Sequence, residues 1–191
     1  MRITPVAHGL DDIVGVSLGP RSPGLHMSDI YGSLFQELEP KRFKKDSAPD
    51  PLRFELGLAL ETVLEKGLID RWSAERPGEF TTIEGILYTP DAIIFNGSPR
   101  LGEIKLTWMS CKDVPREEAK SFPPRFDKWL CQIKAYAYHL ELSQARLLAY
   151  FVNGANRASP ELLAWDIDFT ARELKENWQM LLNFARQRKM L

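Results

Sequence analysis

The chain is poor in cysteine and in long apolar runs, and each shortage excludes a class of protein. Cys111 and Cys131 are its only cysteines and form no C-x-x-C pair, which argues against a disulfide framework and a structural zinc site. The apolar runs are too short to span a bilayer, and the opening residues MRITPVAHGLDDIVG lack the apolar stretch of a signal peptide. We therefore expect a cytoplasmic protein with no membrane partner.

The chain also lacks an excess of positive charge. It has 25 Lys and Arg against 26 Asp and Glu, a net charge of −1, so the simplest argument for a nucleic-acid partner is absent. Local clustering matters more for phosphate contact, and two basic clusters are present, KRFKK at 41–45 and RQRK at 186–189. Each cluster is also compatible with an ordinary solvated loop or helix end.

The size and composition indicate one globular domain. The chain has 191 residues, 44% of them apolar and 27% charged, and no internal repeat or low-complexity tract. We expect a single domain over 1–191, with an N-terminal arm and short helix at 1–50, a core at 51–169 and a C-terminal helix at 170–191.

The periodicity of apolar residues predicts a mixed α/β order. Helical spacing occurs at 27–40, where Ser28 is the expected cap, and again at 52–68, 129–142 and 170–189. Strand patterns occur at 81–88, 91–95, 101–108, 145–154 and 161–169, of which the first three should form an antiparallel meander. The proline-rich segment 112–128 should be a loop or broken helix. The fold class is therefore α/β (α+β-like), with a mixed central sheet flanked by helices.

The stretch TPDAIIFNGSPRLGEIKLT at 89–107 carries the main chemical signal. Glu103 and Lys105 are two apart on a predicted strand and so share one face, and a turn at 96–98 would fold the strand of Asp91 beside them. Two carboxylates and a lysine at one place suit Mg²⁺ or Mn²⁺ and an attacking water. Glu-x-Lys also occurs at Glu118 and at Glu173, where a strand context is missing. The alternative interpretation is a hairpin with an exposed cross-strand ion pair.

Two flanking helices add candidates. Gly57 and Glu61 form G-x-x-x-E on the helix at 52–68, where Glu61 lies close to the expected buried face. Gln132 and Tyr136 are one helical turn apart on the helix at 129–142. A surface glutamate and an ordinary amphipathic helix are the alternative explanations.

The order of these motifs resembles the PD-(D/E)xK nuclease superfamily, in its RecB-like and lambda-exonuclease-like (YqaJ-type) branch, over about residues 52–152. The resemblance implies a restriction-endonuclease-like core and one or two Mg²⁺ or Mn²⁺ ions. The implied metal ligands are Glu61, Asp91, Glu103 and the carbonyl of Ile104. Lys105 would be the catalytic lysine, and Gln132 and Tyr136 would support the site and the DNA end.

Departures from the family pattern indicate which branch of the family the chain resembles. Two cysteines cannot hold the four-cysteine iron–sulfur cluster of several RecB-like nucleases, and no Walker A sequence indicates a fused motor. The absence of a histidine between Leu52 and Leu68 favours the lambda-exonuclease-like branch of phage recombination enzymes. We expect a metal-dependent exonuclease acting on linear duplex DNA in recombination or phage DNA processing. The alternatives are an endonuclease of junction or restriction type and a non-cutting DNA-binding subunit.

Two routes would let this chain hold DNA. The resemblance implies a homo-oligomeric ring, in some members a trimer, and a single-strand annealing protein as a partner inside the bacterial host cell. In an open monomer, basic residues near the site would instead bind phosphates. The candidates are Lys41, Arg42, Lys44, Lys45, Arg116 and Arg125. The aromatic side chain of Phe43, Phe122 or Phe126 could wedge against a frayed DNA end.

Overall fold

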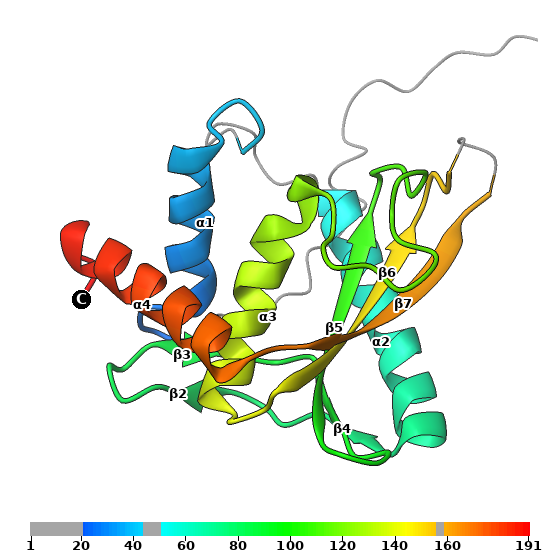
Figure 1. Cartoon of the computed structure of the whole chain (residues 1–191), viewed down its shortest axis with the longest axis horizontal. Coiled ribbons are helices and arrows are strands. Elements are labelled where there is room, and N and C mark those ends of the chain that lie inside the picture. Colours follow the sequence, from blue (N-terminus) through cyan, green and yellow to red (C-terminus); the bar gives the residue numbers. More distant parts are fainter. Residues whose placement is uncertain (1–20, 44–50, 156–158) are drawn as a thin grey trace, which may run out of the picture.

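The computed structural model describes residues 21–43, 51–155 and 159–191 (Figure 1). Its main sheet has five strands within these residues, in the order β1-β4-β5-β6-β7. Their bounds are Ala74–Glu75 for β1, Ala92–Ile94 for β4, Arg100–Thr107 for β5, Gln144–Phe151 for β6 and Glu161–Asp168 for β7. Strands β5 and β6 are parallel, whereas the other neighbours are antiparallel. The prediction of a mixed sheet flanked by helices is confirmed.

Helices cover both faces of this sheet. Three of them, α1 (Met27–Leu38), α3 (Asp127–His139) and α4 (Ala171–Gln187), pack together on one side, and α2 (Pro51–Trp72) lies on the other (Figure 1). A short 3-10 turn, Pro124–Phe126, leads from the loop after β5 into α3. None of the helices in the described ranges is both long enough and apolar enough to cross a bilayer.

The alternation of β5 separates two environments. Leu101 and Glu103 face the helices α1 and α3, where the larger apolar cluster lies, whereas Ile104 belongs to a smaller cluster with Leu148 on the α2 side. Successive side chains of a strand point to opposite faces of a sheet, so Leu101, Glu103 and Lys105 share the face toward α1 and α3, and Ile104 lies on the other. Glu103 is consequently buried under α3.

The C-terminal helix forms as predicted. Thr170 caps α4, because its hydroxyl accepts the backbone N–H of Glu173 at 3.2 Å while the Glu173 carboxylate accepts the N–H of Thr170 at 2.8 Å. The apolar residues at helical spacing on α4 are buried, namely Leu174, Trp178, Leu181, Leu182 and Ala185.

The predicted cap of the first helix was wrong. Ser28 lies inside α1, and His26 holds the cap position. At the end of α1, Leu38 is 62% exposed, whereas Ile30 and Leu34 are buried. On α2, Leu56 and Val63 are exposed, since the helix meets the sheet through Leu64 and Trp72.

The expected strand at 81–88 is instead a separate two-stranded hairpin. Its strands are β2 (Phe80–Thr81) and β3 (Leu87–Tyr88), and the chain turns between them at Gly85, whose φ of +79° favours glycine. The place beside β4 is taken by β1, so the antiparallel meander holds only for β4 and β5.

Candidate metal and nucleic-acid site

The β4–β5 hairpin brings Asp91 next to the Glu103 strand. Ala92 pairs with Gly102, and a Cβ built on Gly102 would lie 3.1 Å from the Cβ of Ala92, so the glycine lets the two strands approach closely. The Asp91 carboxylate accepts a hydrogen bond of 2.7 Å from the backbone N–H of Ile104. The hairpin that the sequence predicted therefore forms, and it holds Asp91 against the strand of Glu103 and Lys105.

Glu103 is the buried centre of the site. It is fully buried, and its Oε1 accepts hydrogen bonds from the Lys105 ammonium and, at 2.5 Å, from Nε2 of Gln132. Its other oxygen, Oε2, is buried and has no hydrogen-bond partner among the described residues. Burial first, and then the neighbouring Asp91 charge, raise the pKa of Glu103 to about 8.

Lys105 carries the compensating charge. Burial alone would lower the pKa of its ammonium, but the charges of Glu103 and Asp91 outweigh burial and raise it above its ordinary value. The lysine is therefore protonated at neutral pH in this structure. In that state it can donate hydrogen bonds to a water or a phosphate oxygen, and it cannot act as a base.

Two tyrosines surround the buried carboxylate. Tyr136 is buried on α3 one turn after Gln132, and Tyr31 is buried on α1. Burial raises the pKa of both tyrosines, that of Tyr31 to about 12, and the charge of Glu103 raises each of them further. The two tyrosines thus lie within electrostatic reach of Glu103, which accepts the hydrogen bond from Gln132. Tyr31 is absent from the predicted site residues, although a hydroxyl on the apolar face of a predicted helix was the available signal.

Glu61 lies farther out on α2. Its side chain is half-buried and forms an ion pair of 3.5 Å with Arg76, and its charge adds to the forces that raise the pKa of Glu103. Across the residues that the structure describes, no three His, Cys, Asp or Glu side chains converge as a metal-binding group. The structure therefore brings Asp91 and Glu103 together, but it does not join Glu61 to them as a third ligand.

The donor set at β5 nevertheless fits a small divalent cation. Mg²⁺ is commonly bound through one or two carboxylates while it keeps several waters, so Asp91 and Glu103 meet its requirement. The unpartnered Oε2 of Glu103 is a buried carboxyl oxygen that a cation would satisfy. Burial first, and then the charge of Asp91, raise the pKa of Glu103, and a bound cation would offset both.

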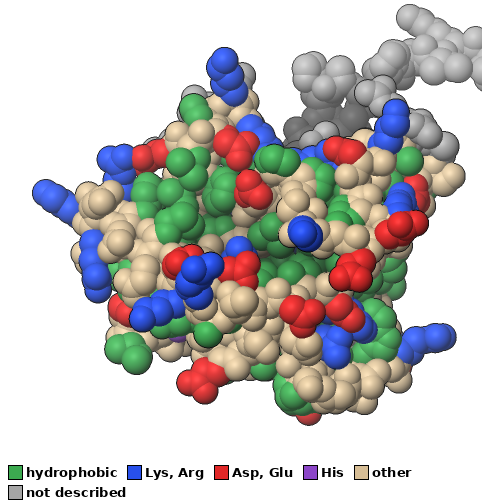
Figure 2. All heavy atoms as spheres, in the orientation of Figure 1, with side chains coloured by type: hydrophobic (Ala, Val, Ile, Leu, Met, Phe, Trp, Pro, Cys, Tyr) green, Lys and Arg blue, Asp and Glu red, His purple; other side chains and the backbone are tan. Residues whose placement is uncertain are grey.

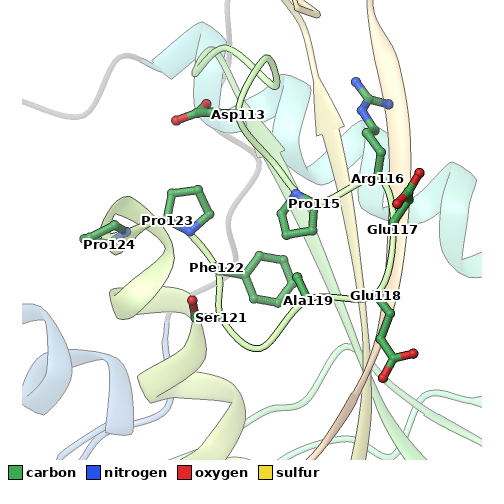
Figure 3. Close-up of a pocket in the computed structure, with 10 residues that line it drawn as sticks. All are labelled: Asp113, Pro115, Arg116, Glu117, Glu118, Ala119, Ser121, Phe122, Pro123 and Pro124. Carbon is green, nitrogen blue, oxygen red and sulfur yellow. The ribbon is translucent and has the colours of Figure 1, made fainter.

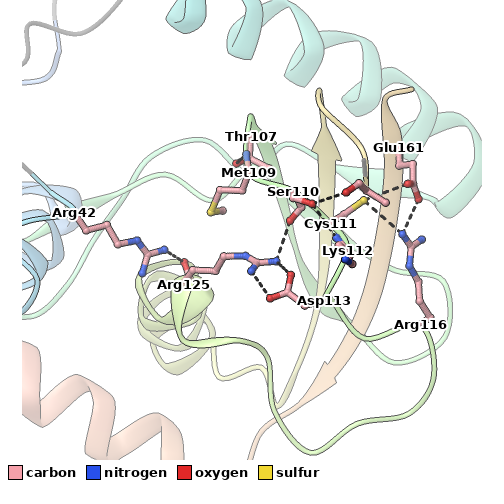
Figure 4. Close-up of polar contacts among 11 residues, drawn as sticks. Arg42, Thr107, Met109, Ser110, Cys111, Lys112, Asp113, Arg116, Arg125 and Glu161 are labelled. Atoms are coloured by element: carbon pink, nitrogen blue, oxygen red, sulfur yellow. Dashed lines mark hydrogen bonds and ion pairs between the residues drawn. The ribbon is translucent and has the colours of Figure 1, made fainter. Parts of the chain in front are cut away.

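The arginines predicted to bind DNA already have partners inside the protein (Figure 4). Arg125 forms a two-pronged ion pair with Asp113 and donates to the carbonyl of Ser110 at 2.9 Å. Arg42 donates to the carbonyl of Arg125 and pairs with Glu39 at 2.9 Å. These contacts tie the segment after α1 to the start of α3.

The loop before α3 is similarly self-contained. Arg116 pairs with Glu161 at 2.7 Å and contacts the buried Cys111. The loop borders a hollow of about 600 Å³ whose lining includes Asp113, Glu117 and Glu118 (Figure 3). Three carboxylates around one paired arginine do not suit an anion.

The remaining predicted DNA contacts are three lysines and three aromatic side chains. Lys41 is exposed, whereas Lys44 and Lys45 lie outside the described residues. Among the possible wedges, Phe126 is fully buried, Phe122 stacks on it at 5.2 Å between ring centroids, and Phe43 packs against Phe35 at 5.9 Å.

A second hollow lies beside the buried carboxylate site. It has a volume of about 540 Å³ and is lined by Arg21, Ser22, His26, Ser28, Arg76, Glu79, Leu87, Tyr88, Thr89 and Tyr136. Arg21 donates to Ser28 at 2.5 Å and pairs with Asp29 at 2.8 Å, and Arg76 pairs with Glu61 at 3.5 Å. Its arginines are therefore paired, as Arg116 is, but a single carboxylate, Glu79, lines this hollow where three line the one bordered by the loop.

Comparisons with known proteins give matches at the level of structure. No family model and no curated protein sequence matches the chain. The alkaline exonuclease LHK-Exo from Laribacter hongkongensis superposes with a TM-score of 0.52 at 14% identity, over 86% of this chain and 87% of that chain. The complex of LHK-Exo with dAMP gives 0.50 at 14% identity over the same shares, and SSO0001 gives 0.49 at 16% identity over 87% and 78%. This chain is therefore similar in fold to LHK-Exo.

Proposed function

We propose that the protein is a divalent-metal-dependent deoxyribonuclease, and specifically an exonuclease that degrades linear duplex DNA in recombination or phage DNA processing. The observation that carries this proposal is Glu103, a fully buried carboxylate that shares one oxygen with Lys105 and Gln132 and leaves the other without a partner beside Asp91. A structural ion pair would need no second carboxylate and no unsatisfied oxygen at this depth.

Asp91, Glu103 and the carbonyl of Ile104 would hold a Mg²⁺ or Mn²⁺ ion, and Glu61 would add negative charge from α2. When bound, the ion supplies charge stabilisation for the phosphoryl oxygens and a more acidic water. Lys105, protonated beside Glu103, would orient the water or hold a phosphate oxygen. Gln132 would keep the Glu103 carboxylate in place, and Tyr136 would support Gln132.

The hollow beside Tyr136 favours an exonuclease over an endonuclease. Its arginines, serines and histidine offer donors to a phosphate, and its position next to the carboxylate site would suit the end of a strand. The likeness in fold to LHK-Exo, an alkaline exonuclease, agrees with this choice. An endonuclease would instead need the duplex to continue past the site on both sides.

The surface is compatible with local contacts to DNA. Figure 2 shows Lys and Arg side chains interspersed with Asp and Glu over one face of the molecule, without a broad area of positive charge. We propose that the assembly is a ring of several copies, which would keep DNA bound without a uniformly basic surface. A single-strand annealing protein would then take up the product strand.

The test is digestion of end-labelled linear duplex and of closed circular plasmid, each with Mg²⁺ and with EDTA. We expect loss of the linear duplex only, and only with Mg²⁺. Nicking of the circle would establish the endonuclease, and binding without cleavage of either substrate would establish a non-cutting subunit. Linear substrates with a 5′-phosphate, a 3′-phosphate or neither then show which end the hollow receives.

A further inference from the structure

One face of α3 continues past the carboxylate site to Lys128. This lysine precedes Gln132 by four residues and Tyr136 by eight, so the three side chains lie in a row along the helix. Gln132 contacts Glu103, and Tyr136 borders the polar hollow. Lys128, at the other end of the row, is half-buried.

The ammonium of Lys128 rests on aromatic rings. Its Nζ lies 4.9 Å from the ring centroid of Phe43 and 5.8 Å from that of Tyr31. No ion pair or hydrogen bond to another described residue holds it, in contrast to Arg42, Arg116 and Arg125, which each have a carboxylate partner. Aromatic faces attract a cation without neutralising it, so Lys128 keeps its charge available.

A second cation lies within electrostatic reach. Burial and the charge of Lys105 both lower the pKa of Lys128, which shows that the two ammonium groups repel each other. Tyr31, which contacts Lys128 through its ring, also interacts electrostatically with Lys105. Two lysines held near one another, only one of them paired with an acid, form a place where an anion with several charges is favoured.

We propose that Lys128 binds a phosphodiester group of the DNA, one or two phosphates away from the bond that is cut. This inference rests on the proposed nuclease function. Four helical residues separate Lys128 from Gln132 by about 6 Å along the helix axis. Consecutive phosphates of one strand are about 3.4 Å apart along the duplex axis, so a duplex lying along α3 would bring a neighbouring phosphate to Lys128 while another lies at Glu103.

The first experiment measures how salt weakens binding. The probe is a short linear duplex, bound with Ca²⁺ in place of Mg²⁺ to slow cleavage, at several salt concentrations. Lys128→Met keeps the packing of the stem and removes the charge, and Lys128→Arg restores the charge. Lys134→Met is the matched control, because Lys134 is half-buried on another side of α3, with its Nζ 5.8 Å from the ring of Phe169.

The expected result is specific to one charge. Lys128→Met should lower the slope of log affinity against log salt by about 0.7 to 0.9, whereas Lys128→Arg and Lys134→Met should leave it unchanged. An unchanged slope in Lys128→Met, or an equal loss in Lys134→Met, overturns the inference. A merely structural role would lower the melting temperature of Lys128→Met without changing the slope.

The second experiment changes the DNA and uses the wild-type protein. Duplexes in which one phosphate is replaced by a neutral methylphosphonate should bind weakly when the replaced group is one or two positions from the cut bond. The same duplexes should bind Lys128→Met without a further loss. If no position near the cut bond weakens wild-type binding, the inference is wrong.

The two proposals fail in different ways. If wild-type protein neither binds nor cleaves DNA, the proposed function fails and the role of Lys128 fails with it. If wild-type protein cleaves DNA and Lys128→Met keeps the full salt slope, only the role of Lys128 is lost.

Discussion

The burial of Glu103 should make the metal-free protein less stable as the pH rises. The folded-state pKa of Glu103 is raised from 4.5 to about 8, so between these values the folded protein binds a proton that the unfolded chain has released. The stability that this bound proton contributes is therefore fully present below about pH 4.5 and is lost as the pH approaches about 8. A pKa about 3.5 above its ordinary value corresponds to about 5 kcal/mol, which is the upper limit of the loss.

The assay is urea unfolding in EDTA at intervals from pH 5 to pH 8.5, with wild type and Glu103→Gln side by side. The difference between the two curves isolates Glu103 from the other carboxylates, and the free energy of unfolding of wild type should fall more steeply. Mg²⁺ at pH 8 should restore wild type, because the ion takes the place of the proton, and should have little effect on Glu103→Gln. Parallel curves for the two proteins in EDTA would refute the reasoning.

Three further outcomes are expected. Lys105→Ala should abolish cleavage of labelled linear duplex and, because it leaves the buried Glu103 without its charge partner, should also lower the free energy of unfolding; cleavage within about tenfold of wild type contradicts its role. Asp91→Asn should weaken Mg²⁺ binding in a titration, whereas the exposed control Glu118→Gln should not; equal weakening in both would place the metal elsewhere. Sedimentation with DNA should show an assembly larger than a monomer, and degradation should survive excess trap DNA; a monomer at working concentration ends the proposal of a ring.

The parts of the site that the sequence predicts are those set by local geometry. The alternation of β5 puts Glu103 and Lys105 on one face, and the helical repeat puts Gln132 and Tyr136 on one face; both follow from spacing alone. The turn between β4 and β5 then determines where Asp91 lies. Such features need no knowledge of how distant elements pack.

The parts that the sequence did not predict depend on how helices dock. Tyr31 and Lys128 gain their significance only because α1 lies against α3, and nothing in the spacing of either helix indicates that contact. The roles of the arginines depend on tertiary partners such as Asp113 and Glu161 in the same way.

The strand expected at 81–88 failed for a different reason. Its threonine, isoleucine and tyrosine residues favour extended backbone, but Gly85 permits a turn that divides the segment. A glycine in a strand pattern is compatible with a continuous strand and with a turn until the neighbouring strand is known.

The hydrogen bonds around Asp91 and Glu103 also have a consequence for folding. The contact between Asp91 and Ile104 spans 13 residues of sequence, and that between Gln132 and Glu103 spans 29. Short loops close early and long ones late, so the hairpin that carries Asp91 should form before α3 reaches it. Until α3 docks, Glu103 remains hydrated and the pKa of its carboxyl group stays at its ordinary value. The unusual chemistry of this residue is therefore acquired only when α3 docks, together with the tertiary structure that surrounds it.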